Sequence, residues 1–342
     1  MKYYHSQDMS PYNTLRLHAQ AAAQVAINND VELVACLEWA RVRSLSIVPL
    51  GEGSNVVLAG NVDALVVLQR TCGIEIIART DDTVVLRVAA GENWHALVRW
   101  TLQQGYFGLE NLALIPGTVG AAPIQNVGAY GVELQSVLLR VHARQLTDGR
   151  IIELNGKECE FGYRDSIFKH GLKDQLLITA VDLELSLHPK VNTRYPAIAN
   201  YCLEHGIVSP TPPEIFDAVV SIRQSKLPDP AVEPNAGSFF KNPLLQAHEA
   251  QGLVAAYSSL PLYPQSDGRV KVSAAWMIDQ CGWKGFRKEG LGVHPEHALV
   301  LVNYGSNSGP QLLSLANDIA ATVRRTFGIN LEIEPRVYGS RP

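Results

Sequence analysis

Three observations predict an α+β protein that is built from more than one domain. The chain has 342 residues, which is more than one average domain holds. Short β-type runs joined by tight turns recur along it, and segments with helical spacing of apolar residues separate them. The hydrophobic fraction of 46% and the charged fraction of 18% are ordinary for a globular chain, so we expect no disordered tail.

The first 70 residues are predicted to form a small α+β lobe. Apolar residues in 31–44 recur with helical spacing. The β-rich runs 45–51 and 62–70 lie on either side of a glycine turn. A helix and two strands of this length are enough for one compact lobe.

The middle of the chain is predicted to be an α+β unit rich in antiparallel pairs. Residues 73–80 and 83–90 are extended runs joined by two aspartates, which indicates a hairpin. The next segment has an apolar helical face and stops at Gly105. Residues 137–154 form a second predicted hairpin, and 176–185 supply a further strand.

A proline-rich exit marks the predicted start of another domain. Thr211 is the expected N-cap of a helix, with Glu214 at the capping-box position, and this helix should end at Pro228. The chain beyond it is predicted to hold a helix around "AAWMIDQCGW" and a strand at "HALVLVN".

The C-terminal part contains the most regular helix of the sequence. Its apolar residues fall on one face, and Gly328 is placed to terminate it. Residues 329–339 are predicted to form a closing strand that puts Glu332, Glu334 and Arg336 on one face. The face of the predicted helix consists of Leu312, Ala316, Ile319, Val323 and Phe327.

Composition also limits the partners of the protein. The formal net charge is −4 and the pI is near 6.2, so no basic face for nucleic acid is expected. No apolar run approaches eighteen residues and the N-terminus lacks an apolar leader, which disfavours membrane insertion and export. The five cysteines are dispersed and never form CxxC, so we expect no disulfide framework, no metal site and a cytoplasmic location.

Two glycine-rich segments carry the first chemical signals. In "GEGSN", Gly51 to Asn55, small residues after a strand can bring backbone N–H groups close to a pyrophosphate, although a simple β-turn explains the same pattern. The spacing matches neither GxGxxG nor GxxxxGK[ST]. The apolar segment 114–131, with four glycines, is suited to packing against a large flat ligand. Together they suggest a dinucleotide.

The polar candidates are ambiguous by themselves. Arg164, between aromatic and apolar neighbours, needs a buried partner or an anionic ligand, but pairing with Asp165 or lying over Tyr163 would also satisfy it. Glu334 could lie on a solvated strand face. Ser238, in "NAGSFFKNP", lacks the GxSxG elbow of a nucleophile, so a turn or N-cap role competes with any catalytic role.

Six motifs, in order, give the chain a resemblance to a known family. They are "GEGSN", "LENLALIPGTVGAAPIQNVGAYGVE", "FGYRDSIFK", "KLPDP", "NAGSFFKNP" and "LEIEPRV". From about Asn13 to Gly339 the chain resembles the UDP-N-acetylenolpyruvoylglucosamine reductases, also called UDP-N-acetylmuramate dehydrogenases, in the form that has a tyrosine loop.

The resemblance implies a two-lobed FAD-binding module of the vanillyl-alcohol-oxidase (PCMH) type plus a separate α+β substrate-binding domain. On this basis we expect lobe 1 at 1–69, lobe 2 at 70–226, the substrate-binding domain at 227–328 and a returning C-terminal strand at 329–342, with the PCMH-type module at about 13–186. Non-covalent FAD would be held by Gly51, Glu52, Gly53, Ser54, Asn55, Pro116, Gly117, Thr118, Gly120, Ala121, Ile124, Gln125, Asn126, Gly128 and Tyr130.

The resemblance also implies a reaction. NADPH would reduce FAD, and hydride would pass from flavin N5 to the terminal carbon of the enolpyruvyl ether of UDP-N-acetylglucosamine enolpyruvate. Arg164 would stabilise the charge that develops on the carboxylate, Glu334 would assist, and Ser238 would protonate C2. We expect a cytoplasmic monomer that serves peptidoglycan precursor synthesis, has no metal and has no nucleic-acid or membrane partner.

Substrate contacts carry over less firmly. His297 stands where the family has a glutamine-like contact, and the motif around Tyr195 is looser than the others. Two other readings compete: a different non-covalent FAD oxidoreductase acting on an alcohol or lactone, and a UDP-sugar-binding protein without catalysis. The positions implied to touch substrate are Tyr195, Arg223, Lys226, Asn242, Tyr263, Lys284, His297 and Arg336.

Overall fold

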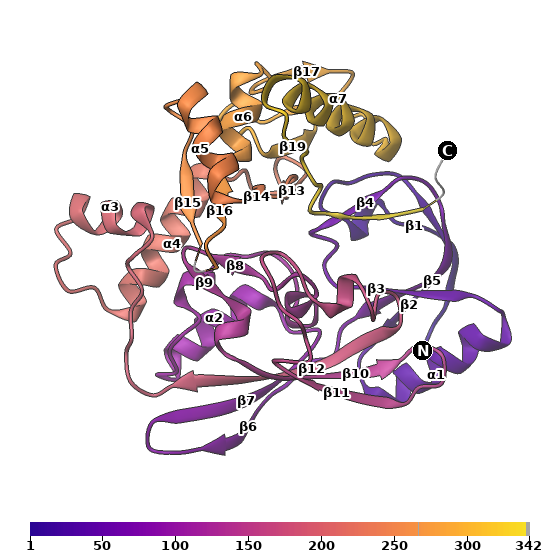
Figure 1. Cartoon of the computed structure of the whole chain (residues 1–342). Coiled ribbons are helices and arrows are strands. Elements are labelled where there is room, and N and C mark those ends of the chain that lie inside the picture. Colours follow the sequence, from indigo (N-terminus) through magenta and orange to yellow (C-terminus); the bar gives the residue numbers. More distant parts are fainter. Residues whose placement is uncertain (266, 340–342) are drawn as a thin grey trace. The chain divides into compact units, whose positions relative to one another are not determined.

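Figure 1 shows a computed structural model of the chain, which describes residues 1–265 and 267–339. Two compact units can be distinguished, and each combines segments that are distant in sequence. The first unit comprises Met1–Gln7, Ala21–Gly53 and Asp63–Ser225, and the second comprises Asp8–Gln20, Ser54–Val62 and the chain from Lys226 onward. The domain division expected from the sequence stays a prediction, and residues 340–342 of its last segment lie outside the described residues.

The first sheet of the first unit contains the strands that the glycine turn was expected to separate. β3 (Ser46–Leu50) and β5 (Val62–Gln69) are adjacent and parallel, with Ser46 opposite Ala64 and Leu50 opposite Leu68. They are therefore not a hairpin, because the intervening β4 (Val56–Leu58) pairs elsewhere. The order of the sheet is β1 (Tyr4–Asp8), β2 (Gln20–Ile27), β5, β3.

Helix α1 (Asp30–Val42) packs on this sheet as its apolar spacing predicts. Asn29 caps it by accepting a 2.9 Å hydrogen bond from the Glu32 N–H, which satisfies one of the unpaired amides of the first turn. The helix buries Leu33, Cys36, Leu37 and Ala40 against β2 and β5 residues such as Val25 and Leu65. Burial of a stripe of this size is the main source of helix stability in proteins.

The second sheet of the first unit is antiparallel throughout, as the predicted hairpins require. One of its faces is apolar, with Val84, Leu86 and Val88 alternating along β7 and Val181 and Leu183 along β12. The strand order is β11 (Ile151–Asn155), β10 (Leu138–Gln145), β12 (Leu176–Ser186), β7 (Thr83–Ala89), β6 (Ile74–Arg79).

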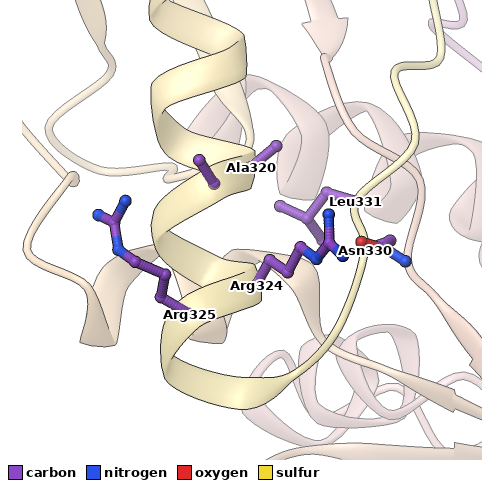
Figure 2. A pocket seen from close by; sticks show the side chains of 6 residues that line it. Ala320, Arg324, Arg325, Asn330 and Leu331 are labelled. Carbon is purple, nitrogen blue, oxygen red and sulfur yellow. The ribbon is translucent and has the colours of Figure 1, made fainter.

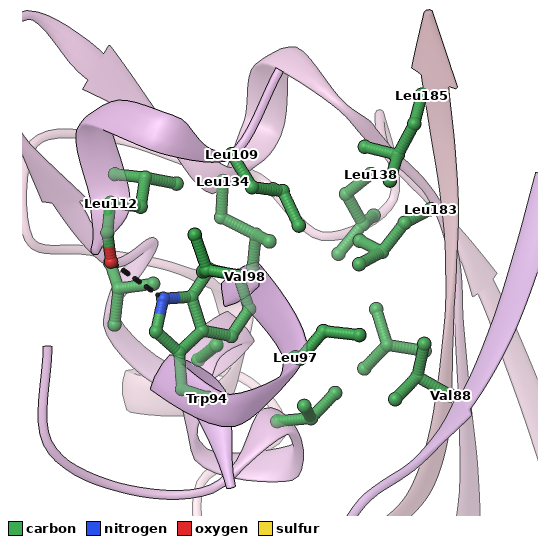
Figure 3. Close-up of a cluster of buried hydrophobic side chains, with 14 of the residues drawn as sticks. Val88, Trp94, Leu97, Val98, Leu109, Leu112, Leu134, Leu138, Leu183 and Leu185 are labelled. Atoms are coloured by element: carbon green, nitrogen blue, oxygen red, sulfur yellow. Dashed lines mark hydrogen bonds between the residues drawn. The ribbon is translucent and has the colours of Figure 1, made fainter. Parts of the chain in front are cut away.

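Helix α2 (Trp94–Gln103) contributes its apolar face to the core on this sheet (Figure 3). Trp94 is 1% exposed, and its indole N–H donates to the Leu112 carbonyl at 2.9 Å. This bond satisfies the one polar atom of the buried ring. It also ties the start of α2 to the loop that precedes the second glycine-rich segment.

The remaining elements of the first unit are short or lie at its end. α4 begins where the capping pattern predicts, and Thr211 donates through both its N–H and its hydroxyl to Glu214 Oε2 at 2.7 Å. These elements are η2 (Glu110–Leu112), η3 (Val119–Gln125), β8 (Gly128–Ala129), β9 (Val132–Glu133), η4 (Leu134–Ser136), η5 (Ile167–Lys169), α3 (Pro196–Glu204) and α4 (Pro212–Lys226).

In its described residues, the second unit has small sheets and three α-helices. The predicted apolar face of α7 (Gly309–Phe327) is confirmed, and Gly328 ends this helix at φ +73°. One sheet has the order β13 (Asn235–Ser238), β19 (Val300–Asn303), β18 (Leu291–Val293), β17 (Arg287–Lys288). The other elements are η1 (Ser10–Tyr12), β14 (Leu244–Leu245), α5 (Ala247–Ala256), β15 (Leu262–Pro264), β16 (Val270–Val272) and α6 (Ala274–Gln280).

The closing strand is shorter than the sequence predicts. β20 comprises only Arg336–Tyr338 and pairs with β4 in parallel, with Val337 opposite Val57. Pro335 precedes it, and a proline cannot donate to a sheet ladder. Glu334 therefore lies outside the strand, where its N–H donates to the Phe239 carbonyl at 2.8 Å.

Candidate active site

The glycines of the two glycine-rich segments lie together in the first unit. Glu52 Oε2 accepts a 2.9 Å hydrogen bond from the Gly117 N–H, and Glu52 Oε1 accepts one of 2.7 Å from Asn93 Nδ2. A Cβ added to Gly51 would lie 2.5 Å from Thr118 Oγ1, so only glycine lets the loops pack this closely. Segments about sixty residues apart thus form one structural feature.

The backbone of these loops suits an anionic ligand. Gly53 and Gly117 are buried and have φ of +66° and +118°, conformations that other residues rarely adopt. Left-handed glycines are the usual components of backbone concavities that bind phosphates. A Cβ at Gly120 would meet the Ala90 Cβ at 2.5 Å, so this glycine serves the packing of the chain on itself. The loop residues therefore fit a dinucleotide such as FAD.

Asn126 holds the second glycine-rich segment in place. Its side chain is fully buried, and its Nδ2 donates to Glu133 Oε2 at 3.0 Å and to the Gly162 carbonyl at 3.1 Å. Its Oδ1 accepts from the Gln135 N–H at 3.0 Å. This residue links the segment to the loop that carries Arg164. Of the other residues expected to hold FAD, Ala121, Ile124 and Gln125 lie in η3, and Ser54 and Asn55 belong to the second unit.

Arg164 lies in a tight turn, half-buried, with its guanidinium against the second glycine-rich segment. Its Nη2 donates to the Gly128 carbonyl at 2.6 Å, and a Cβ at Gly128 would lie 3.1 Å from its Nη1. The guanidinium also lies over the Tyr163 ring at 5.5 Å, whereas Asp165 pairs with His170 at 2.8 Å. Of the two partners that the sequence offered, the Tyr163 ring is therefore one that Arg164 contacts.

A second cation lies near Arg164. The Nε of Arg223 donates to the Leu114 carbonyl at 3.1 Å. Burial lowers the pKa of the Arg223 guanidinium, the nearby Tyr130 phenol opposes this, and the Arg164 charge adds to it. Burial likewise raises the pKa of Tyr130, whose ring meets that of Tyr195 edge-on at 5.2 Å. Two guanidiniums and two phenols in one place favour an anionic ligand with a flat apolar part.

Four residues in the same part of the first unit have a strained backbone. Leu114, Asn126, Tyr130 and Arg164 have φ of +56°, +45°, +48° and +52°. Each such residue costs about 1–3 kcal/mol, and strain of this kind is found at functional sites that the surrounding structure holds in place. The left-handed residues of this region coincide with the predicted site.

In the second unit, Ser238 and Glu334 are brought together. Ser238 is the last residue of β13, opposite Val300, and it follows Gly237 at φ +69°. Next to it, the Phe239 carbonyl accepts from the Glu334 N–H at 2.8 Å, and Phe240 forms a β-bridge with Ile333. A Cβ at Gly237 would meet nothing within 4 Å, so the glycine is needed for its backbone conformation and not for space.

Cationic groups in the second unit surround His297. Burial lowers the pKa of this histidine, and the charges of His294, Lys226 and Lys284 lower it further, although a backbone hydrogen bond opposes them. His297 Nδ1 accepts from the Leu299 N–H at 3.3 Å, and this requires a lone pair on that nitrogen. The imidazole is therefore neutral near pH 7. A diphosphate is the kind of group that such a cluster suits.

The remaining predicted contacts are dispersed over the second unit. Asn242 Oδ1 accepts from the Ala274 N–H at 2.9 Å, so this asparagine also satisfies the first backbone N–H of α6. Tyr263 lies in β15 with the Lys271 ammonium 5.9 Å from its ring centre. Arg336 begins β20, and its guanidinium lies over the Tyr338 ring at 4.9 Å.

The predicted site residues thus fall into two groups. Arg164, Tyr195 and Arg223 belong to the first unit with most of the glycine-loop residues, and Ser238, Glu334 and the other substrate contacts belong to the second. Sequence reasoning missed Asn93, which bonds Glu52, and His95, which bonds the Leu114 backbone. Asn93 could have been found as the N-cap of α2, whereas nothing in the local pattern singles out His95.

An open pocket in the second unit contains none of the predicted residues. It lies between α7 and the segment after it, where Arg324 reaches toward Asn330 while Arg325 points the other way (Figure 2). In the part of the chain that the structure describes, no three His, Cys, Asp or Glu side chains are placed to hold a metal ion. Nor is any helix within 1–265 and 267–339 long and apolar enough to cross a bilayer. The pocket is lined by Ala320, Ala321, Arg324, Arg325, Asn330 and Leu331.

The fold and the paired glycine loops define an FAD-binding oxidoreductase module with an additional α+β domain. Residues 21–155 match the family model described as FAD binding domain, and residues 229–338 match the one described as UDP-N-acetylenolpyruvoylglucosamine reductase, C-terminal domain. The crystal structure of UDP-N-acetylenolpyruvylglucosamine reductase from Thermus caldophilus is similar in fold, with a TM-score of 0.68 over 98% of both chains at 24% identity.

Curated relatives show the family. UDP-N-acetylenolpyruvoylglucosamine reductase from Chromobacterium violaceum is 46% identical over 96% of this chain and 97% of its own length. The protein of that name from Pseudomonas aeruginosa is 45% identical over the same shares of the two chains. The chain belongs to the UDP-N-acetylenolpyruvoylglucosamine reductase family. The resemblance and the fold class that the sequence predicted are confirmed.

Proposed function

We propose that the protein reduces the enolpyruvyl group of UDP-N-acetylglucosamine enolpyruvate to give UDP-N-acetylmuramate, a peptidoglycan precursor, with NADPH as electron donor. Non-covalent FAD, held by the two glycine loops, would supply hydride to the terminal carbon of the enolpyruvyl group. The loop residues with the clearest fit are Gly53 and Gly117, which have the left-handed backbone that a phosphate cradle uses. The rest of the chemistry depends on side chains of this chain.

Arg164 is the proposed stabiliser of the carboxylate on which negative charge develops. Its Nη2 is anchored to the Gly128 carbonyl, so the guanidinium is held before substrate arrives. A fixed cation in a site poor in water stabilises a developing charge strongly because it need not reorganise. Arg223 is close enough to Arg164 for the Arg164 charge to lower the pKa of the Arg223 guanidinium. Arg223 would therefore add to the positive field.

Ser238 is the proposed proton donor to C2, and Glu334 assists it. A hydroxyl is a weak acid, but an enolate-like carbon takes its proton when the donor is held within reach. The hydride adds to one carbon and the proton to the other, so the double bond becomes a single bond and the NADPH is oxidised.

One observation supports the assignment most directly. Ser238 and Glu334 are 96 positions apart in sequence, yet the Glu334 N–H donates to the carbonyl of Phe239, the residue directly after Ser238, in the second unit. Together with membership of the family, this pairing favours a shared role on one substrate.

Half-reactions test the function. The purified protein should be yellow, should bleach on addition of NADPH, and should be reoxidised without oxygen by UDP-N-acetylglucosamine enolpyruvate. Ser238→Ala should bleach at the normal rate and be reoxidised by this substrate roughly 100 to 10,000 times more slowly, the usual range for a lost general acid. Normal reoxidation of the alanine variant would contradict the proton-donor role, and no reoxidation of the unaltered protein would contradict the function itself.

We also propose that the enzyme is a cytoplasmic monomer that prefers NADPH to NADH. The dispersed thiols and the absence of a basic face in the composition support the cytoplasmic location. Light scattering on the eluting protein and bleaching rates with the two nucleotides test the oligomeric state and the preference.

A further inference from the structure

Both polar groups of the Leu114 backbone are held by side chains. Its N–H donates to His95 Nδ1 at 2.9 Å, and its carbonyl accepts from Arg223 Nε at 3.1 Å. Leu114 is at φ +56°, a strained conformation for a residue with a Cβ. The two hydrogen bonds therefore hold this residue where it would not remain by itself, and they connect His95 to Arg223.

His95 is suited to its contact with Leu114. It lies in the first turn of α2, half-buried, and its ring stacks on Phe216 of α4 at 5.4 Å with an angle of 8° between the planes. Because an amide N–H only donates, the contact with Leu114 requires a lone pair on Nδ1, so the neutral ring has its proton on Nε2. This Nε2 cannot also accept from Arg99 Nη2, which faces it at 3.1 Å as a nearby charge and not as a hydrogen-bond donor. The tautomer is set by the Leu114 backbone.

Every charged group that faces His95 disfavours its protonation. Arg99 of α2 places Nη2 3.1 Å from Nε2, and Arg223 of α4 lies beyond the Leu114 carbonyl. Burial lowers the pKa of His95 below its usual 6.5, and the charges of Arg99 and Arg223 lower it further. The position at the N-terminus of a helix acts in the same direction. His95 is therefore neutral at pH 7 and available as an acceptor.

We propose that His95 is a positioning residue, which orients Arg223 toward substrate by accepting the Leu114 N–H and so fixing the Leu114 carbonyl. The inference rests on the proposed function, because it takes Arg223 to be a substrate contact. His95 touches neither substrate nor flavin in this scheme. Its effect should appear in substrate affinity and not in the rate of flavin reduction.

The proposal has a pH dependence of defined sign. A proton on Nδ1 removes the acceptor, so Leu114 is released and Arg223 loses its anchor. Since the pKa of His95 is lowered from 6.5, KM for substrate should be constant above pH 6.5 and should rise as the pH falls through the lowered value. Low pH should leave NADPH-driven bleaching unaffected by this group.

Two substitutions of His95 distinguish the effect of its hydrogen bond with Leu114 from the effect of its ring packing. His95→Phe keeps the stack on Phe216 but leaves the Leu114 N–H without an acceptor. His95→Asn loses the ring but keeps an acceptor, Oδ1, close to the place of Nδ1 and does not titrate. We expect KM for UDP-N-acetylglucosamine enolpyruvate to rise about tenfold in His95→Phe, the size associated with one buried unpaired N–H, with FAD content and bleaching rate unchanged. His95→Asn should have nearly normal KM without the acid-side rise.

Hydrogen exchange supplies a readout that does not depend on activity. The peptide that contains Leu114 should exchange about tenfold faster in His95→Phe than in the unaltered protein at the same pH, and at a nearly normal rate in His95→Asn. This comparison tests the His95–Leu114 bond directly in the intact holoenzyme.

The outcomes are distinguishable. If the unaltered protein does not turn over the substrate, the proposed function is wrong. If it does, and His95→Phe has the same KM as the unaltered protein, the positioning role is wrong. Equal defects in His95→Phe and His95→Asn would also overturn it, because they would reveal a packing role for the ring.

Discussion

Glu52 and Gly117, which are 65 positions apart in sequence, are joined by a hydrogen bond of 2.9 Å from the glycine N–H to the carboxylate. The other oxygen of Glu52 accepts from Asn93, so one acidic side chain connects both glycine loops to the start of α2. An acid would be an unusual neighbour for the pyrophosphate that these loops are proposed to hold, since like charges repel. The geometry explains its presence, because the carboxylate is directed at the protein backbone.

Removal of this carboxylate should weaken FAD binding. We expect Glu52→Ala to lower FAD affinity about tenfold or more, because the Gly117 N–H loses its acceptor and the loops separate. Glu52→Gln keeps one acceptor and should have an intermediate affinity. Titration of the apoprotein with FAD, followed by flavin fluorescence, measures this. Glu184→Ala, at an exposed position of β12, is the matched control, and equal affinity of Glu52→Ala and this control would contradict the role.

A methyl group at Gly128 should displace Arg164. In Gly128→Ala the new Cβ would be 2.8 Å from Glu133 Cγ and 3.1 Å from Arg164 Nη1, both shorter than comfortable contacts. We expect kcat per bound FAD to fall about 10- to 100-fold, since the guanidinium is moved from the place where charge develops.

Steady-state kinetics of Gly128→Ala and Gly171→Ala test this prediction. At Gly171 the nearest atom to an added Cβ is Ile167 Cγ1 at 3.6 Å, an ordinary contact, so this control should keep normal kcat. A normal kcat in Gly128→Ala would show that the position of Arg164 does not limit the reaction.

His297 should make the fold less stable in acid. Its pKa is lowered from 6.5 in the folded protein, so the unfolded chain binds a proton that the folded chain resists. The free energy of unfolding should therefore decrease as the pH drops below 6.5, until the lowered pKa is reached. His297→Gln should reduce this dependence and leave stability at pH 8 almost unchanged. Urea unfolding of His297→Gln and of the unaltered protein between pH 5 and 8 measures this difference. Parallel curves of unfolding free energy against pH would contradict the prediction.

Asp182 should stabilise the five-stranded sheet. Burial opposes its charge, but hydrogen bonds from Arg87 at 2.8 and 2.9 Å and a contact of 2.8 Å with His142 outweigh burial and lower the pKa of Asp182 to about 2. Asp182→Asn should cost about 2–3 kcal/mol of unfolding free energy at pH 7. Because the folded pKa is the lower one, this stabilisation exists above pH 3.8 and is lost as the pH falls through about 2.

Chemical denaturation at pH 7 and pH 3 measures the Asp182 effect. The difference between Asp182→Asn and the unaltered protein should be largest at pH 7 and smaller at pH 3. Asp63→Asn, at an exposed position of β5, should change the unfolding free energy by less than about 0.5 kcal/mol at either pH. A difference that did not depend on pH would assign the effect to packing and not to charge.

Local patterns predicted most of the regular elements correctly. The period of apolar residues located α1, α2 and α7, and the polar turns located the β6–β7 and β10–β11 hairpins, because these signals act over a few residues. The order of the six motifs predicted the family, which the curated relatives confirm. The ends of the last strand were missed because alternation continues through Glu332 and Glu334, while Pro335 interrupts the ladder.

These local patterns could not predict which segments that are distant in sequence contact one another. A period of two or 3.6 shows which face of an element is apolar, but it does not show which segment covers that face. The parallel pairing of β3 with β5, the bond between Glu52 and Gly117, and the anchoring of Leu114 by His95 and Arg223 all join distant residues. Local chemistry thus defined the elements and the candidate residues, and long-range packing selected the contacts that orient them.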